Sequence, residues 1–182
     1  MTRRRTAVPA AVLAAVLALS ACSDGGSDTV AAPEPSPKAT ACPGAPTPVA
    51  APADATKDLQ TKPVITVPKT PAPTALQVSD IVVGEGDLAC AGQNVEMQYV
   101  GVTYADGKQF DASWDRGEPF PFQLGGGQVI GGWDQGIVGM KVGGRRQLVI
   151  PPDLGYGAQG AGPDIPPGAT LVFVVDLVSV DS

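Results

Sequence analysis

The chain contains no histidine, and aromatic residues make up only 5% of its 182 residues. The absence of histidine excludes Ser-His-Asp and Cys-His catalytic groups, a histidine general base and any zinc site with a histidine ligand. Most hydrolase chemistry is thereby excluded. Basic residues are also scarce, because 12 Lys and Arg against 18 Asp and Glu give a formal net charge of −6. This acidic balance argues against a nucleic-acid partner, since binding phosphates requires positive charge.

The first 21 residues have the pattern of a bacterial signal peptide. Three arginines at 3–5 precede an apolar stretch at 7–19, which is too short for a settled membrane span. The run Leu-Ser-Ala-Cys that ends at Cys22 resembles the bacterial lipobox and implies lipidation of Cys22; an ordinary cleaved signal is the alternative. A single lipid would hold the mature chain at the cell membrane, outside the cytoplasm, without a spanning helix.

The next two segments are rich in proline. Residues 22–56 have no periodic apolar pattern and many Pro, Ala, Ser and Thr, which predicts a disordered tether. Residues 57–75 differ because Val64-Ile-Thr-Val67 has strand composition between prolines. We expect an extended segment there, either an added edge strand or more linker. The folded domain is expected over 76–182.

Within this domain the apolar pattern has mainly the period of strands. Val95, Met97 and Tyr99 alternate with polar residues, as in a half-buried strand, and Ala105-Asp-Gly107 predicts a hairpin turn. Further strands are expected at 76–83, around Phe110, around Phe120 and Phe122, at 145–150 and at 169–180. Val172 and Val174 give the last strand a second apolar face, which either residues 64–67 or a partner would have to cover.

One helix is expected among these strands. Trp133, Ile137 and Met140 recur at the spacing of one helix face, which predicts a helix of about two to three turns before Gly143-Gly144. Strands in antiparallel order around one short helix indicate an α+β domain.

Four segments carry a resemblance to a known family. They are DGKQFDASWDRGEPFPFQLG, QVIGGWDQGIVGMKVGGRR, IPPDLGYG and IPPGATLVF, which begin at residues 106, 128, 150 and 165. Their order and spacing resemble FKBP-type peptidyl-prolyl cis-trans isomerases over roughly the last hundred residues. The resemblance implies a curved antiparallel sheet wrapped around one short helix. It also implies rotation about X-Pro peptide bonds in an apolar pocket, with no covalent intermediate, no cofactor and no metal.

The resemblance also implies roles for particular residues. The catalytic set would be Phe110, Asp111, Ile130, Trp133, Tyr156 and Phe173, and the substrate-binding set Tyr99, Arg116, Phe120, Val129 and Ile165. Trp133 would lie under the prolyl ring, while the Tyr156 hydroxyl and the Ile130 N–H would meet substrate carbonyls. Asp111, partnered by Tyr99 and Arg116, would shape the pocket electrostatically. Each aromatic alone could be plain core and the ion pair plain surface, but their joint occurrence favours a cavity.

The implied partners are proline-containing segments of exported proteins, the membrane through the lipid anchor, and the macrolide inhibitors of the family. Residues 161–164, Ala-Gly-Pro-Asp, depart from the family pattern, because aliphatic side chains often cover the substrate there. This departure leaves the substrate preference and the macrolide affinity open. A non-catalytic module that holds proline-containing segments at the membrane is the alternative function, and a purely structural lipoprotein is a third.

Two cysteines remain once Cys22 is assigned to lipid. Outside the cytoplasm Cys42 and Cys90 could pair and tie the tether to the domain. On the chain-entropy account such a bond would stabilise the fold by about 4 kcal/mol at most. The pairing is a hypothesis at this point.

Overall fold

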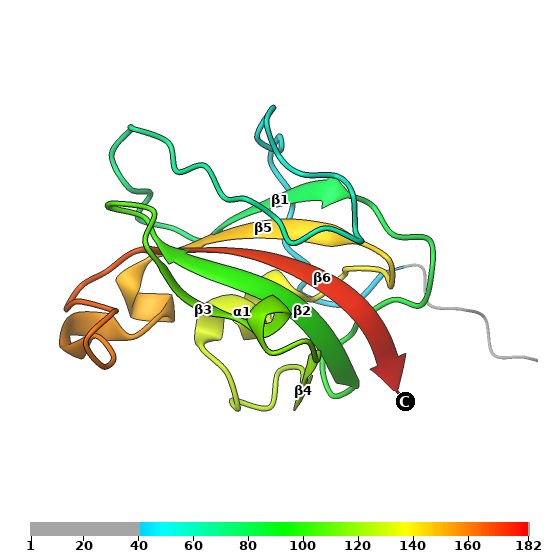
Figure 1. Ribbon diagram of the computed structural model, residues 1–182. Coiled ribbons are helices and arrows are strands. Elements are labelled where there is room, and N and C mark those ends of the chain that lie inside the picture. The colour runs from blue at the N-terminus through cyan, green and yellow to red at the C-terminus, as the bar shows by residue number, and fades with distance from the viewer. Residues whose placement is uncertain (1–40, 182) are drawn as a thin grey trace, which may run out of the picture. The chain divides into compact units, whose positions relative to one another are not determined.

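A computed structural model describes residues 41–181 of the chain (Figure 1). The predicted signal peptide, the lipidation site Cys22 and the part of the predicted tether at 22–40 lie outside the described residues. In the described range no helix combines the length and the apolar character that crossing a membrane requires.

Six strands form one antiparallel sheet in the order β1-β5-β6-β2-β3, with β4 paired to β2. The strands are β1 (Gln77–Val82), β2 (Asn94–Thr103), β3 (Gln109–Ala112), β4 (Phe120–Gln123), β5 (Arg145–Ile150) and β6 (Leu171–Asp181). One helix, α1 (Gly131–Gly136), packs on β5, and single 3-10 turns occupy Ser113–Asp115, Pro152–Leu154 and Gly157–Gln159. The α+β fold expected from the sequence is confirmed.

The pairing of β2 with β6 is the longest in the sheet. It runs from Asn94 opposite Asp181 to Thr103 opposite Leu171, with one irregularity after Glu96. In the first half of β2, apolar residues are buried and polar ones are exposed or half-buried, as the alternating pattern predicted. From Val100 onward both faces are buried, so this end of the sheet has a core on each side.

The second core lies on the face of the sheet away from α1. It contains Val100, Val102, Tyr104, Ala112, Val149 and Val172, and Ile65 and Val67 pack against it. Residues 57–75 therefore supply the cover that Val172 required. They pair with no strand, so the segment is extended but is not an added edge strand: it crosses the outer face of the sheet (Figure 1). The flanking prolines, which cannot donate to a ladder, account for this.

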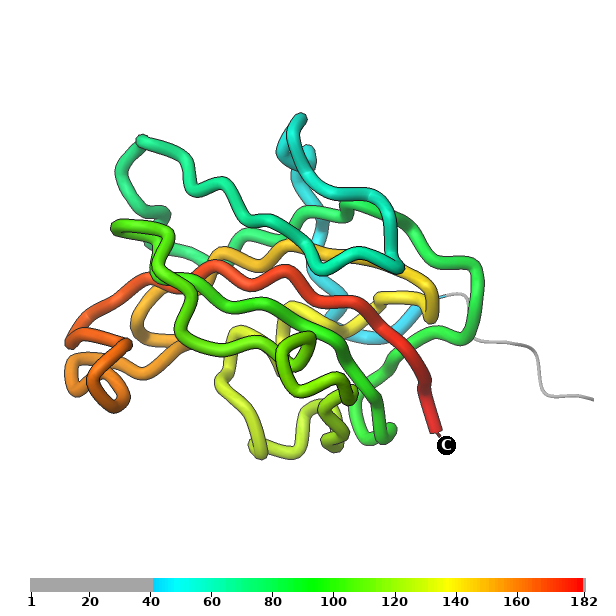
Figure 2. The backbone as a smooth tube through the Cα atoms, viewed as in Figure 1, coloured from blue at the N-terminus to red at the C-terminus, as the bar shows by residue number. Residues whose placement is uncertain are grey.

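Residues 41–56 also lie against the domain, which differs from the disordered tether expected for them. Cys42 and Cys90 form a disulfide with their Cα atoms 5.4 Å apart. The Val49 N–H donates to the Val78 carbonyl at 2.7 Å, which places this part of the chain beside β1 (Figure 2). A covalent bond and backbone hydrogen bonds thus hold a stretch whose composition alone indicates disorder. We call residues 41–75 the extension.

A buried arginine holds the middle of the extension. The Arg145 guanidinium, fully shielded from solvent, donates to the Asp176 carboxylate at 2.5 and 2.8 Å. It also donates to the carbonyls of Thr56, Asp58 and Thr61 at 2.9, 3.0 and 3.1 Å. All five N–H groups of the guanidinium therefore have acceptors, which is the condition for burying such a charge without a large penalty.

The helix α1 is shorter than the two to three turns expected. It ends at Gly136, and the chain turns at Gly139, which has a φ of 84°. Ile137 and Met140 lie beyond the helix but are buried. Their spacing therefore predicted the burial of both side chains correctly and the length of the helix wrongly. Two of the three glycines of α1 allow close packing on β5, because a Cβ at Gly132 would come within 2.5 Å of Ile150 and a Cβ at Gly136 within 2.7 Å of Leu148.

We expect Arg145→Leu to lower the free energy of unfolding by about 3–5 kcal/mol, because it leaves the Asp176 carboxylate buried without a partner. Urea denaturation measures this change, and hydrogen exchange should show faster exchange around residues 56–61. Lys62→Met is the control, since Lys62 and Asp115 form a half-exposed ion pair at 2.5 Å whose loss should cost less than about 1 kcal/mol. Equal effects of the two substitutions would contradict the assigned importance of the buried pair.

Candidate active site

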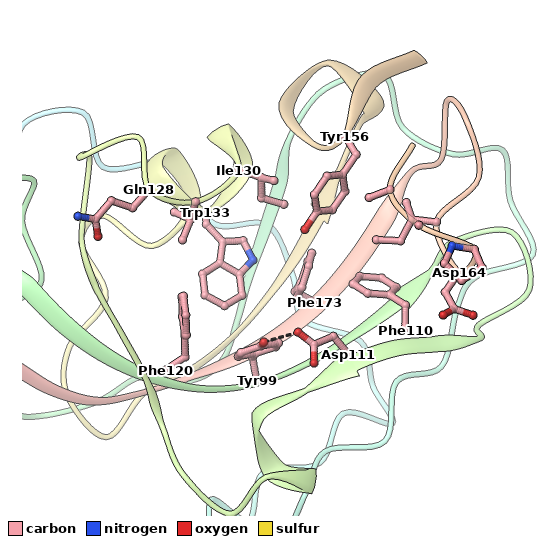
Figure 3. A pocket seen from close by; sticks show the side chains of 15 residues that line it. Tyr99, Phe110, Asp111, Phe120, Gln128, Ile130, Trp133, Tyr156, Asp164 and Phe173 are labelled. Atoms are coloured by element: carbon pink, nitrogen blue, oxygen red, sulfur yellow. Dashed lines mark hydrogen bonds between the residues drawn. The ribbon is translucent and has the colours of Figure 1, made fainter. Parts of the chain in front are cut away.

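A cavity of about 710 Å³ opens between the sheet, α1 and the loop that precedes β6 (Figure 3). Its lining residues are Tyr99, Phe110, Asp111, Phe120, Gln128, Val129, Ile130, Trp133, Tyr156, Ala161, Gly162, Pro163, Asp164, Ile165 and Phe173. Ten of the eleven residues singled out as catalytic or substrate-binding are in this set. The eleventh, Arg116, lies behind Asp111 and Tyr99 and does not line the cavity.

Aromatic rings form the floor and one wall. The Trp133 indole, 4% exposed, lies edge-to-face with Tyr99 at 5.0 Å and with Phe173 at 5.3 Å between ring centroids. Phe110 meets Phe173 at 5.4 Å in the same geometry. These contacts are possible because β2 has glycine at 101, where a Cβ would lie 2.7 Å from both Phe110 and Phe173. Mutual edge-to-face contacts fix the ring orientations and leave an apolar hollow above the indole.

Asp111 is a carboxylate that lines the cavity and is held by hydrogen bonds from two neighbouring side chains. The Tyr99 hydroxyl donates to Asp111, and Arg116 donates to Asp111 at 2.6 Å and to the Tyr99 oxygen at 2.8 Å. Burial, together with the hydrogen bond to Asp111, raises the pKa of Tyr99 to about 12. Hydrogen bonds to Tyr99 and Asp111 raise the pKa of Arg116 above its usual range. The Tyr99 hydroxyl and the Arg116 guanidinium therefore stay protonated near neutral pH.

Several polar donors of lining residues have no hydrogen-bond partner in residues 41–181, and one of them, the indole N–H of Trp133, is buried. Two others belong to Tyr156 and Ile130. The Tyr156 hydroxyl points into the cavity (Figure 3) and makes no hydrogen bond within this range. Its pKa is raised by burial and by the negative charge of Asp111. The backbone N–H of Ile130, the residue that precedes α1, is likewise unbonded there. Both donors remain available for carbonyl oxygens of a bound peptide.

The rim of the cavity contains the lining residues outside the predicted set, namely Gln128 and residues 161–164. Ala161 and Ile165 form a small bridge of two backbone hydrogen bonds, at 2.9 and 3.2 Å. Asp164 pairs with Lys108 at 2.8 Å. Gln128 lines the opposite end, where its amide oxygen accepts from the Gln123 N–H at 3.1 Å. Its position directly before Val129 was the only sequence signal for it.

Comparisons with known proteins agree with this geometry. The family profile described as FKBP-type peptidyl-prolyl cis-trans isomerase matches residues 86–178. The chain belongs to this family. It is 57% identical over 120 residues to the FK506-binding protein of Streptomyces anulatus, an alignment that covers 65% of this chain and 97% of the relative. It is 54% identical over 118 residues to the probable FK506-binding protein of Corynebacterium glutamicum, with 65% and 98% covered.

Solved structures give the same result. The crystal structure of AtFKBP13 matches with a TM-score of 0.55 and 41% identity over 61% of this chain and 96% of that one. FkpA from Escherichia coli matches with a TM-score of 0.54 and 44% identity over 59% and 49%. The chain is therefore an FKBP-type peptidyl-prolyl cis-trans isomerase, and the expectation of an enzyme of this family is confirmed.

We expect the isomerase kcat/KM to be constant from about pH 6 to about pH 9. The raised pKa values keep the hydroxyls of Tyr99 and Tyr156 protonated throughout this range, so a loss should begin only above about pH 10. Histidine, the usual group that titrates near neutrality, is absent. A cis-trans assay on a proline tetrapeptide at several pH values measures this, and a bell-shaped profile centred near neutrality would contradict it.

Proposed function

We propose that the cavity catalyses rotation about X-Pro bonds by seating the prolyl ring on the Trp133 indole. The observation that carries this proposal is the open hollow above Trp133, bordered by Phe110, Ile130 and Tyr156. An indole sealed inside solid packing could not receive a ring. The same residues would therefore act together as a substrate site, and not as ordinary core.

The chemistry requires no proton transfer and no nucleophile. The barrier of about 18–20 kcal/mol arises from amide resonance, which is lost when the C–N bond twists. Water stabilises the charge-separated planar amide, so a dry aromatic cavity favours the twisted form relative to bulk solution. A reduction of the barrier by about 7 kcal/mol corresponds to an acceleration of roughly 10⁵-fold.

The polar groups of the cavity would orient the peptide. The Tyr156 hydroxyl and the Ile130 N–H would donate to carbonyl oxygens beside the prolyl ring, which holds the substrate while the bond between them rotates. Asp111, fixed by Tyr99 and Arg116, would act through its negative charge at the rim of the cavity. These roles are consistent with the position of the Asp111–Tyr99–Arg116 network, which lies at the edge of the cavity and not under the indole.

We expect Phe110→Ala to lower kcat/KM on a proline tetrapeptide roughly 10- to 100-fold, because it removes a large apolar wall from the cavity. Asp111→Ala should lower it less, since no step needs its proton. A protease-free cis-trans assay on residues 41–182 measures both. Val178→Ala, an exposed position on β6 outside the cavity, is the control and should leave the rate unchanged. Activity of the wild type equal to the uncatalysed rate would refute the catalytic proposal.

We further propose that the enzyme acts on exported proteins outside the cytoplasm, held at the membrane by a lipid on Cys22. The Cys42–Cys90 disulfide supports this compartment, because such bonds persist in oxidising surroundings and are rare in the cytosol. The signal-peptide pattern ahead of Cys22 supports the anchor. Because its bacterial relatives are named FK506-binding proteins, we also propose that macrolides of that kind bind in the same cavity.

Expression of the full chain in a bacterium that processes lipoproteins tests the anchor. We expect labelled fatty acid to be incorporated and the protein to sediment with membranes, and Cys22→Ser to abolish both. Mass spectrometry without reduction should find no free thiol at Cys42 or Cys90. Recovery of an unlabelled soluble protein, or of free thiols, would contradict the respective part of the proposal.

A further inference from the structure

A second groove adjoins the isomerase cavity. Its volume is about 840 Å³, and its wall shares Pro163 and Asp164 with the cavity. In the close view Asp164 lies at one end of the cavity beside Phe110, at the far side from Gln128 (Figure 3). A peptide that leaves the cavity past Asp164 therefore enters the groove. Three segments line the groove, namely 68–72 of the extension, 103–108 between β2 and β3, and 163–170 before β6.

The extension supplies one complete wall of this groove, and it is fixed there. Ile65 and Val67 pack on the outer core of the sheet just before the wall begins. Within the wall, the hydroxyls of Thr70 and Tyr104 lie 3.2 Å apart in a hydrogen bond. The groove is thus formed without any ligand. An extended chain advances about 3.3 Å per residue, so a groove of this size accommodates several residues beyond the cavity.

Four charged side chains line the groove among the described residues, and three of them have a hydrogen-bond or ion-pair partner there. Asp106 accepts hydrogen bonds from the Thr103 hydroxyl and, at 3.0 Å, from the Lys108 N–H. The Lys108 ammonium pairs with Asp164 at 2.8 Å. Lys69 is exposed and makes no ion pair within residues 41–181. Within residues 41–181, Lys69 is therefore the cation of the groove that has no carboxylate partner, and it lies on the extension side.

We propose that the groove binds the polypeptide that flanks the X-Pro bond, and that Lys69 selects for an acidic side chain there. The inference rests on the proposed function, because the prolyl residue must occupy the cavity for its neighbours to reach the groove. The occupant is an unfolded or extended segment of a substrate protein, since the wall shared at Pro163 and Asp164 makes the two sites one continuous surface. The extension thereby becomes part of the substrate site.

The test compares peptides of two lengths on the chain from residue 41. A tetrapeptide fills only the cavity, whereas decapeptides with the proline near either end reach the groove from one side or the other. Each decapeptide is made with Glu, and in a matched form with Gln, three to five residues from the proline. We expect one of the two decapeptide series, either that with the proline near the N-terminus or that with the proline near the C-terminus, to exceed the tetrapeptide in kcat/KM. In that series Glu should exceed Gln by about two- to fivefold, and salt should reduce the difference.

Two variants and one control locate the effect. Lys69→Gln should abolish the preference for Glu, and Ala72→Trp, which fills the groove from an exposed position of its wall, should abolish the advantage of length. Neither should change the rate on the tetrapeptide. Lys141→Gln removes the same charge at an exposed residue that lines neither site, and should retain the preference.

Equal kcat/KM values on the Glu and Gln peptides of both decapeptide series would overturn the proposal. A preference for Glu that persists in Lys69→Gln would also overturn it. Failure to isomerise the tetrapeptide would instead refute the catalytic function. In that case, titration of the decapeptides by intrinsic tryptophan fluorescence, to which Trp133 at the cavity floor contributes, still decides the question. A Glu preference in affinity that Lys69→Gln removes supports the groove, and no such preference refutes it.

Discussion

The close approach of α1 to β5 is the constraint on which the cavity depends. Gly132 and Gly136 face the sheet, and side chains there would collide with Ile150 and Leu148. With glycine at both positions the short helix lies directly on the strand, and the Trp133 ring is held low against the sheet. A helix of six residues cannot cover the whole concave face. The uncovered part is the hollow that receives substrate, so it results from the same packing that builds the core.

The second face of the sheet needed a different solution. The outer face of the sheet is apolar where Val100, Val102 and Val172 lie, and without a cover it would expose a large hydrophobic surface. The extension packs on this face and shields it from water. Its attachment combines apolar contacts with a buried guanidinium that bonds to backbone carbonyls and to Asp176. Carbonyl acceptors depend little on side-chain identity, so a segment of low sequence complexity can be held firmly. The matched family profile begins only at residue 86, after this segment.

Much of the fold and of the cavity could be predicted from the sequence, because alternation in β2 and the spacing of the aromatic motifs are local signals. The path of the extension could be predicted only in part: the disulfide and the cover by residues 64–67 were among the possibilities, but the proline-rich composition of residues 43–56 indicates disorder, and Arg145 lies far from its partners in the sequence. The end of α1 was predicted wrongly because Ile137 and Met140 are buried although they lie beyond the helix. The spacing of apolar residues indicates which side chains are buried, but it does not determine the backbone conformation. The groove beside Lys69 depends on three distant segments, and no local pattern indicates it.

The disulfide has a mechanical consequence. Cys42 lies at the N-terminal end of the extension, and its bond to Cys90 spans 48 positions. Tension applied to the chain upstream of Cys42 passes directly through the sulfur atoms into the loop before β2. Residues 43–75 lie inside the covalent ring and bear none of that load. The extension, including the segment at 68–72, would therefore stay in place on the sheet when tension is applied to the chain upstream of Cys42.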